Sequence, residues 1–373
     1  MFLVRLIARN AFRHRLRAFL TILGVTIAIL AFGLLRTLLD AWYAGVAASS
    51  ANRLVTRNAI SLTIHLNLSM KEKIRQVEGV TRVAAGNWFG GVYVDEKNFF
   101  PNFAVDAEAY LDLYPEMIIP PDQRTAFLRD RKGALAGQKL MDRFGWKLGD
   151  QVTLKGTIFP GQWEMTIRAV YRGARKDVDE SQLLFHWDYL NERMKQTNKR
   201  RADQVGFYMI GIADPTRAAE ISRDIDRQFV NSQAETLTET EKAFQLGFVS
   251  MSDAILLAIK LVSFVVILII LAVAANTMAM SVRERLGEFA VLKTLGFGRW
   301  FVAGMILGES LTLSLTGGAL GLALIQPLAG AIGRSMAQFF PVFEASRETL
   351  VLGGSAALAV GLAAAVLPAV RAA

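Results

Sequence analysis

The sequence has no cysteine and only three histidines, and charged residues make up only 20% of it. Without cysteine there is no disulfide scaffold, no thiolate zinc site and no cysteine nucleophile. The histidines His14, His65 and His186 lie far apart along the chain, so a histidine-rich metal cluster is not expected. The sequence therefore predicts no metal site, and it leaves the redox compartment open.

Two motifs that mark nucleotide-binding and hydrolytic enzymes are also missing. No Gly-x-x-x-x-Gly-Lys-Ser/Thr segment occurs, so the chain has no P-loop of its own, and no Gly-x-Ser-x-Gly segment occurs either. The acidic residues Asp177, Asp179 and Glu180 stand beside Arg175 and Lys176, a mixture typical of a solvated loop. We therefore expect no catalytic residue and no cofactor bound by this chain.

What the sequence does have is an uneven distribution of charge. Residues 40–253 contain 28 basic and 28 acidic side chains, whereas the remaining residues contain 14 basic and 5 acidic ones, which accounts for the net charge of +9. The basic excess lies beside the apolar ends of the chain, which is typical of a membrane protein. We therefore expect contact with membrane lipid and none with nucleic acid.

Four uncharged runs approach or exceed the roughly 20 residues that a helix needs to cross a bilayer. They are residues 18–35, 261–282, 310–333 and 349–370. A secretory signal peptide is the alternative for the first run, because five arginines precede it and an alanine-rich patch follows it. The run is longer than a usual signal core and the patch lies about a dozen residues beyond it, so an uncleaved helix is favoured.

The short flanks of these runs set the orientation. Lys and Arg concentrate on the cytoplasmic side of membrane proteins, and here they gather before the first run and between the second and third. Both termini are therefore expected in the cytoplasm. The expected domains are a cytoplasmic amphipathic N-terminal helix at 1–17, transmembrane helices at 18–39, 255–282, 300–333 and 349–371, an extracytoplasmic α/β domain at 40–254, a cytoplasmic helix at 283–299 and an extracytoplasmic loop at 334–348.

The N-terminal segment predicts a basic helix on the inner leaflet. Arg5, Arg9, Arg13 and Arg17 recur at a spacing of four residues, which places them on one helical face. The alternative is that these arginines only fix the topology.

The extracytoplasmic domain carries strand and helix patterns. Apolar and polar residues alternate over 60–69, which predicts a half-buried strand, and Ser69 with Glu72 forms a capping-box pattern at the start of a helix. Residues 163–171 alternate as well and predict a hairpin strand. We therefore expect a mixed α/β domain.

The segments that join this domain to the membrane are also expected to be helical. Residues 36–57 continue the first run without proline, and Thr238 with Glu241 forms another capping-box pattern, after which helical sequence runs unbroken to about Ser281. Forty-odd helical residues span roughly 60–65 Å, about twice the hydrocarbon core. The sequence therefore predicts a helical stalk that carries the α/β domain.

Residues 283–299 predict a short helix of mixed charge between two membrane spans. Helical spacing directs its apolar side chains towards one neighbour, and Gly296 can supply a left-handed stop. The apolar side chains are Leu286, Phe289, Ala290 and Leu292. Such a helix is suited to docking with a soluble protein, and the alternative is an interfacial helix without a partner.

This loop resembles the coupling-helix signature of MacB/FtsX-type ABC transporter permeases, a family of lipoprotein-releasing and macrolide-exporter-like systems. Leu286 separates Arg285 from Gly287 where the family usually has Glu-Ile, so either Glu284 or Glu288 would be the acidic residue that faces the ATPase. The resemblance assigns ATPase docking to Arg283, Glu284, Arg285, Gly287, Glu288, Leu292, Lys293, Leu295 and Gly296.

The resemblance covers essentially the whole chain. Residues 9–24 are similar to the family's first span, 308–321 to its third and 368–373 to its Pro-Ala-x-x-Ala-Ala ending, and 134–173 look like its outer-domain core. The implied fold is an α-helical membrane protein with four transmembrane helices and a mixed α/β extracytoplasmic domain on a helical stalk.

The resemblance also implies a function. Two permeases, as a homodimer or a related heterodimer, would bind two copies of a separate ATPase that holds ATP and Mg, in the bacterial inner membrane. ATP hydrolysis would drive extracytoplasmic movement (mechanotransmission), which exports or extracts a lipoprotein, lipid, peptide or amphiphilic drug. A periplasmic adaptor and an outer-membrane channel are further implied partners.

Two other functions stay open. An FtsX-like signal transducer would activate an extracytoplasmic hydrolase without transport, although the large outer domain favours the transporter. A membrane-anchored binding module would need no ATPase. Glu309, a charge about a dozen residues into the third span, is a candidate intramembrane functional residue, and structural pairing is its alternative.

Overall fold

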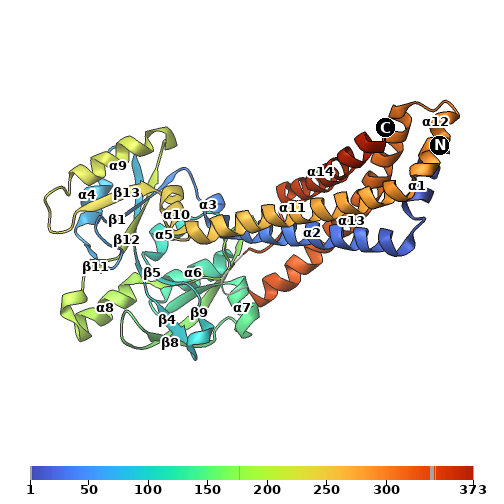
Figure 1. Cartoon of the computed structure of the whole chain (residues 1–373). Coiled ribbons are helices and arrows are strands. Elements are labelled where there is room, and N and C mark those ends of the chain that lie inside the picture. Colours follow the sequence, from blue (N-terminus) through green and yellow to red (C-terminus); the bar gives the residue numbers. More distant parts are fainter. Residues whose placement is uncertain (1, 176, 337–339, 341, 373) are drawn as a thin grey trace. The chain divides into compact units, whose positions relative to one another are not determined.

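The structure is a computed structural model that describes residues 2–175, 177–336, 340 and 342–372, shown in Figure 1. The chain divides into two compact units. The membrane unit comprises Met1–Trp42 and Ser252–Ala373, and the α/β unit comprises Tyr43–Met251.

Among its described residues, the membrane unit contains four helices that are long and apolar enough to cross a bilayer. They are α2 (Arg15–Trp42), α11 (Asp253–Glu284), α13 (Arg299–Ser335) and α14 (Arg347–Ala372). Two shorter helices, α1 (Phe2–Ala11) and α12 (Leu286–Thr294), complete the unit. The four long helices agree with the four spans expected from the uncharged runs. Residues 337–339 and 341 of the expected 334–348 loop lie outside the described residues.

Small residues bring the long helices into close contact. A Cβ on Gly317 or Gly321 of α13 would lie 2.7 Å from the backbone oxygen of Ile22 or 2.9 Å from that of Thr26, so α2 packs directly against the α13 backbone. Hydroxyl groups add hydrogen bonds between helices, and Ser310 Oγ donates to the Gly361 carbonyl at 2.7 Å. Close backbone approach and interhelical hydroxyl bonds are typical of packing between membrane helices.

The α/β unit contains thirteen strands among its described residues. They are β1 (Arg53–Asn58), β2 (Leu66–Asn67), β3 (Val80–Trp88), β4 (Gly91–Tyr93), β5 (Asn102–Val105), β6 (Met117–Ile118), β7 (Gly133–Gly137), β8 (Gln151–Gly156), β9 (Gly161–Gly173), β10 (Leu183–His186), β11 (Gln204–Val205), β12 (Phe207–Ile212) and β13 (Thr236–Thr240). Its α-helices are α3 (Ala44–Ala48), α4 (Met70–Arg75), α5 (Ala107–Leu113), α6 (Pro121–Arg129), α7 (Gln138–Phe144), α8 (Trp187–Thr197), α9 (Ala218–Arg227) and α10 (Glu241–Ser250).

Most of these strands form one mixed sheet. The order is β13-β1-β12-β3-β5-β10-β7-β9-β8-β4, with β6 paired to β9, and β2 pairs with β11 separately. Two pairs of neighbours are parallel, β5 with β10 and β7 with β9, and the other pairs are antiparallel. This confirms the expected mixed α/β domain.

Both faces of the sheet are covered. Leu54 points into a core with α4, α7, α8 and α9, and its neighbour Val55 points into a second core with α5 and α6. We call these the Leu54 face and the Val55 face. Because side chains alternate along a strand, the central strands bury consecutive apolar residues, as Leu183, Leu184 and Phe185 do.

The predicted strand at 60–69 is wrong except for its last part. Only Leu66 and Asn67 are in a strand, and Ile60 is exposed. The reason is a local turn in which the Asn58 side-chain oxygen accepts hydrogen bonds from the Ile60 and Ser61 backbone N–H groups. Side chains of this type compete with strand pairing. Ser69 precedes α4 but makes no capping hydrogen bond.

The predicted unbroken stalk helices are also wrong. The first helix ends at Trp42 and residues 53–58 form β1, so the expected helix over 36–57 is interrupted. The second is interrupted at Met251 and Ser252, between α10 and α11. Thr238 lies in β13, and Thr240 caps α10 in its place, because its hydroxyl accepts a hydrogen bond from the Ala243 N–H at 3.1 Å.

Candidate ATPase-docking site

The loop between α11 and α13 folds into the short helix α12. The helix ends where Gly296 adopts a φ of +91°, a left-handed conformation that residues with a side chain rarely adopt. Around this stop the Gly296 N–H donates to the Lys293 carbonyl and the Phe297 N–H to the Leu292 carbonyl, both at 3.1 Å. Gly296 is therefore the left-handed helix stop that the sequence predicts.

One side of α12 is anchored in the membrane unit. Phe289 is 3% exposed and belongs to a buried cluster that also contains residues of α2, α11, α13 and α14, and Leu292 lies against the same cluster. Leu286 and Ala290, which were expected on this side, are exposed instead. The reason is that only the face of the helix centred on Phe289 meets the spans.

The other side of the loop presents apolar side chains to the surroundings. Val291 is 58% exposed, Leu295 is 70% exposed and Trp300, at the start of α13, is 78% exposed. A Cβ placed on Gly287 or Gly296 would meet no atom within 4 Å. The loop therefore offers an apolar surface with backbone that a partner can approach closely.

Both acidic candidates of the loop are bonded to arginines of the N-terminal segment. The Arg17 guanidinium donates to the Glu284 carboxylate at 2.6 and 2.9 Å, and Arg13 donates to Glu288 at 2.5 Å. Hydrogen bonds from Arg285 and Arg13 hold the pKa of Glu288 below its usual value. Both carboxylates are thus engaged within the chain while remaining partly exposed.

The expected amphipathic helix over 1–17 is wrong in its bounds, and two of its arginines bind carboxylates of the loop instead of facing lipid. The helix α1 ends at Ala11 and α2 begins at Arg15. Arg13 and Arg17 are directed to carboxylates of the loop, so they are not available together as a basic face for lipid. The side chains of Leu3 and Arg5 lie outside those that the structure describes.

Arg285 connects the loop to the interior of the membrane unit. Its Nε lies 2.9 Å from Glu288, and its Nη1 lies 2.8 Å from Glu309 of α13. The side chains of Arg285 and Glu309 are 8% and 10% exposed. Glu309 is therefore half of a buried ion pair, which is the structural alternative left open for it.

The remaining candidates lie on the exposed part of the loop. Arg283 is exposed in the last turn of α11, and Lys293 is exposed in the last turn of α12. Sequence reasoning missed Arg13 and Arg17 as partners of the loop. A usable signal was the matching spacing, because Arg13 and Arg17 are four residues apart and so are Glu284 and Glu288.

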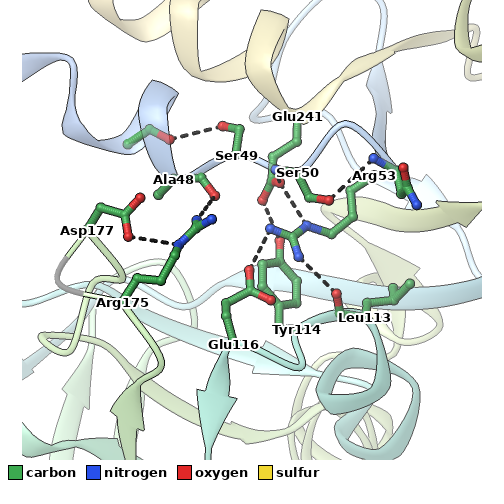
Figure 2. Close-up of polar contacts among 12 residues, drawn as sticks. Ala48, Ser49, Ser50, Arg53, Leu113, Tyr114, Glu116, Arg175, Asp177 and Glu241 are labelled. Carbon is green, nitrogen blue, oxygen red and sulfur yellow. Dashed lines mark hydrogen bonds and ion pairs between the residues drawn. The ribbon is translucent and has the colours of Figure 1, made fainter. Parts of the chain in front are cut away.

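A second charged cluster lies in the α/β unit, where its first and last segments meet (Figure 2). Arg53 of β1 is 4% exposed, and its guanidinium lies 2.7 Å from both Glu241 of α10 and Glu116. Tyr114 donates to Glu241 at 3.0 Å, and burial raises the pKa of this tyrosine well above its ordinary value. The Ser50 N–H also donates to Glu241, at 2.8 Å. The cluster thus ties both ends of the unit together.

Comparison with known proteins gives the family. A model of the MacB-like periplasmic core domain matches residues 18–228, and a model of the FtsX-like permease C-terminal domain matches residues 260–373. The search of curated proteins found no significant match.

Two solved structures are similar in part. One is the extracellular domain of the ABC-type transporter YknZ from Gram-positive bacteria (13% identity, TM-score 0.37, 51% of this chain and 100% of that chain). The other is a domain of a protein described as a permease from Porphyromonas gingivalis (13% identity, TM-score 0.34, 51% and 90%). The MacB-like match spans more than half of the residues, and the chain therefore belongs to the MacB/FtsX-type family of ABC transporter permeases.

Proposed function

We propose that α12 and the residues that follow it dock onto a separate ABC ATPase. The family implies an ATPase subunit. The observation that carries the proposal is the exposure of three apolar side chains: Val291 in α12, Leu295 directly after it and Trp300 at the start of α13. Exposed apolar side chains that gather in one place mark sites of interaction with a protein or a membrane. The open backbone at Gly287 and Gly296 further supports close approach of a partner.

In this proposal Arg285 transmits movement of the docked loop to the membrane helices. A push on α12 acts on Arg285, and the buried bond to Glu309 passes it to α13. Glu284 and Glu288 hold the N-terminal segment through Arg17 and Arg13, so that segment moves with the loop. ATP and Mg would be bound by the ATPase, and this chain would supply no catalytic residue.

The complete assembly would be two permeases and two ATPases in the bacterial inner membrane, with both termini in the cytoplasm. The α/β unit would act outside on a lipoprotein, lipid, peptide or amphiphilic drug, with a periplasmic adaptor and an outer-membrane channel as further partners. The FtsX-like alternative is a transducer that activates an outer hydrolase. The size of the outer domain supports the transporter.

The test is purification of the tagged permease in mild detergent, followed by mass spectrometry of the proteins that accompany it. A stoichiometric P-loop ATPase is expected. Val291→Asp should reduce its recovery about tenfold, because an apolar contact of roughly 1.5 kcal/mol is replaced by a buried charge. Val230→Asp is the matched control, since Val230 is 59% exposed on the α/β unit against 58% for Val291.

The outcomes separate the three functions. An adaptor beside the ATPase supports the transporter, and a hydrolase in its place supports the transducer. If no ATPase accompanies the wild-type permease, or if Val230→Asp removes it as effectively as Val291→Asp, the docking proposal is wrong and the anchored binding module is favoured.

A further inference from the structure

The α/β unit contains a point where neighbouring parallel strands lead to opposite faces of the sheet. β5 is followed by α5, which packs on the Val55 face, and its parallel neighbour β10 is followed by α8, which packs on the Leu54 face. Because the two connections diverge, a crevice opens beyond the carboxyl ends of these strands. In open α/β sheets this is the place where ligands bind.

A cavity of about 770 Å³ lies at this crevice. Its floor is apolar and buried, and the residues that form it come from the interior of β3, the end of β5 and the starts of α5 and α8. They are Ala85, Val105, Ala107 and Trp187. The rim is polar and includes Asn67, Ser69, Lys71, Glu72 and the start of α8. The volume is that of a site for a small organic molecule.

The rim contains four carboxylates, and three of them are paired with bases of the same chain. The pairs are Asp106 with Lys71, Asp203 with Lys195 and Glu72 with Arg75. The fourth carboxylate is Asp188, an exposed residue in the first turn of α8. It has no hydrogen-bond or ion-pair partner among the described residues. Asp188 is therefore the rim carboxylate that is available to bind a ligand.

His186 provides a second unused polar group. The residue lines the cavity and is 7% exposed. Its Nε2 lies 2.8 Å from the Phe127 carbonyl, which can only accept, so Nε2 carries the hydrogen. In the neutral ring Nδ1 is then an acceptor, and it has no partner within the part of the chain that the structure describes.

We propose that this crevice binds an organic cation, a small molecule with an ammonium group on an apolar body. The apolar body covers Ala85, Val105 and Trp187, and the ammonium pairs with Asp188. Anions are disfavoured because the unpaired charge at the rim is the carboxylate of Asp188. The site goes beyond ATPase docking and does not depend on it.

The test uses the full-length permease in a neutral detergent, without an ATPase, so its outcome is separate from that of the docking experiment. Three probes share one indole body and differ in charge: tryptamine, tryptophol and indole-3-propionate. Binding is titrated by saturation-transfer difference NMR, with empty micelles as the blank. Tryptamine is expected to bind saturably, tryptophol about three- to fivefold more weakly, and indole-3-propionate most weakly.

Two variants locate the site. Asp188→Asn should weaken tryptamine binding about three- to fivefold, the effect of one partly exposed ion pair. Asp122→Asn is the matched control, because Asp122 is likewise an exposed acid in the first turn of a helix and lacks a partner among the described residues, but lies outside the cavity. Equal binding of the three probes, an equal loss in both variants, or preference for indole-3-propionate would overturn the proposal.

Discussion

The side chain of Arg285 binds two carboxylates. It is bonded to Glu288 in the loop and to Glu309 in α13, and both Arg285 and Glu309 are buried. Replacing Glu309 with alanine leaves the buried guanidinium without that partner, which costs about 3–5 kcal/mol for a buried pair. We expect Glu309→Ala to lower the thermal unfolding midpoint in detergent, measured by circular dichroism.

The double variant Arg285→Met with Glu309→Leu tests whether the unpaired buried charge is the cause of the lost stability. It removes both charges and keeps similar volume, so much of the lost stability should return. Arg17→Ala is the comparison on the partly exposed side of the network, where a pair contributes less than about 1 kcal/mol. If Glu309→Ala is no more destabilising than Arg17→Ala, the buried pair does not hold the loop.

At the residue scale, the sequence identifies the members of this network and not their pairing. Glu309 stands out because a charge within an apolar run is costly. Its partner lies 24 residues away, across the turn that Gly296 makes, so spacing along one helix cannot find it. The contacts of Arg13 and Arg17 depend on the break between α1 and α2, which the regular arginine spacing conceals.

At the element scale, the end of α12 depends on the left-handed Gly296. Gly296→Ala places a Cβ on a backbone with φ of +91°, which costs about 1–2 kcal/mol and should shift Leu295 and Phe297. We expect ATPase recovery to fall severalfold. Gly298→Ala is the control, since Gly298 has a φ of −67° and open space around its Cβ position. Equal effects of the two variants would contradict this account of the loop.

The membrane helices could be predicted from the sequence, whereas much of the sheet could not. A long uncharged run specifies a span by length alone. The central strands are buried on both faces, so Leu183, Leu184 and Phe185 form an apolar run without alternation. The alternation over 60–69 looked as strand-like as that over 163–171, which is in β9, yet the Asn58 turn prevents pairing at 60–65. The short break at Met251 and Ser252 has no proline or glycine to signal it.

At the scale of the whole molecule, the absence of cysteine permits a direct test of topology, because an introduced cysteine is the only one present. The basic excess around 283–299 predicts that this loop lies in the cytoplasm. In spheroplasts a membrane-impermeant maleimide should label Ser232→Cys at once and Thr294→Cys only after permeabilisation. Labelling of Thr294→Cys in intact spheroplasts would reverse the orientation and rule out cytoplasmic docking.

The α/β unit begins and ends at one place. Its first strand, β1, pairs with its last, β13, and the Ser50 N–H is bonded to Glu241 at the start of α10. A domain whose two ends meet can be inserted into a parent chain, or removed from it, without stretching either part. The α/β unit is thus a domain that could be exchanged as a whole. Such a unit can be exchanged for another while the four membrane-spanning helices and the loop at residues 283–299 stay unchanged.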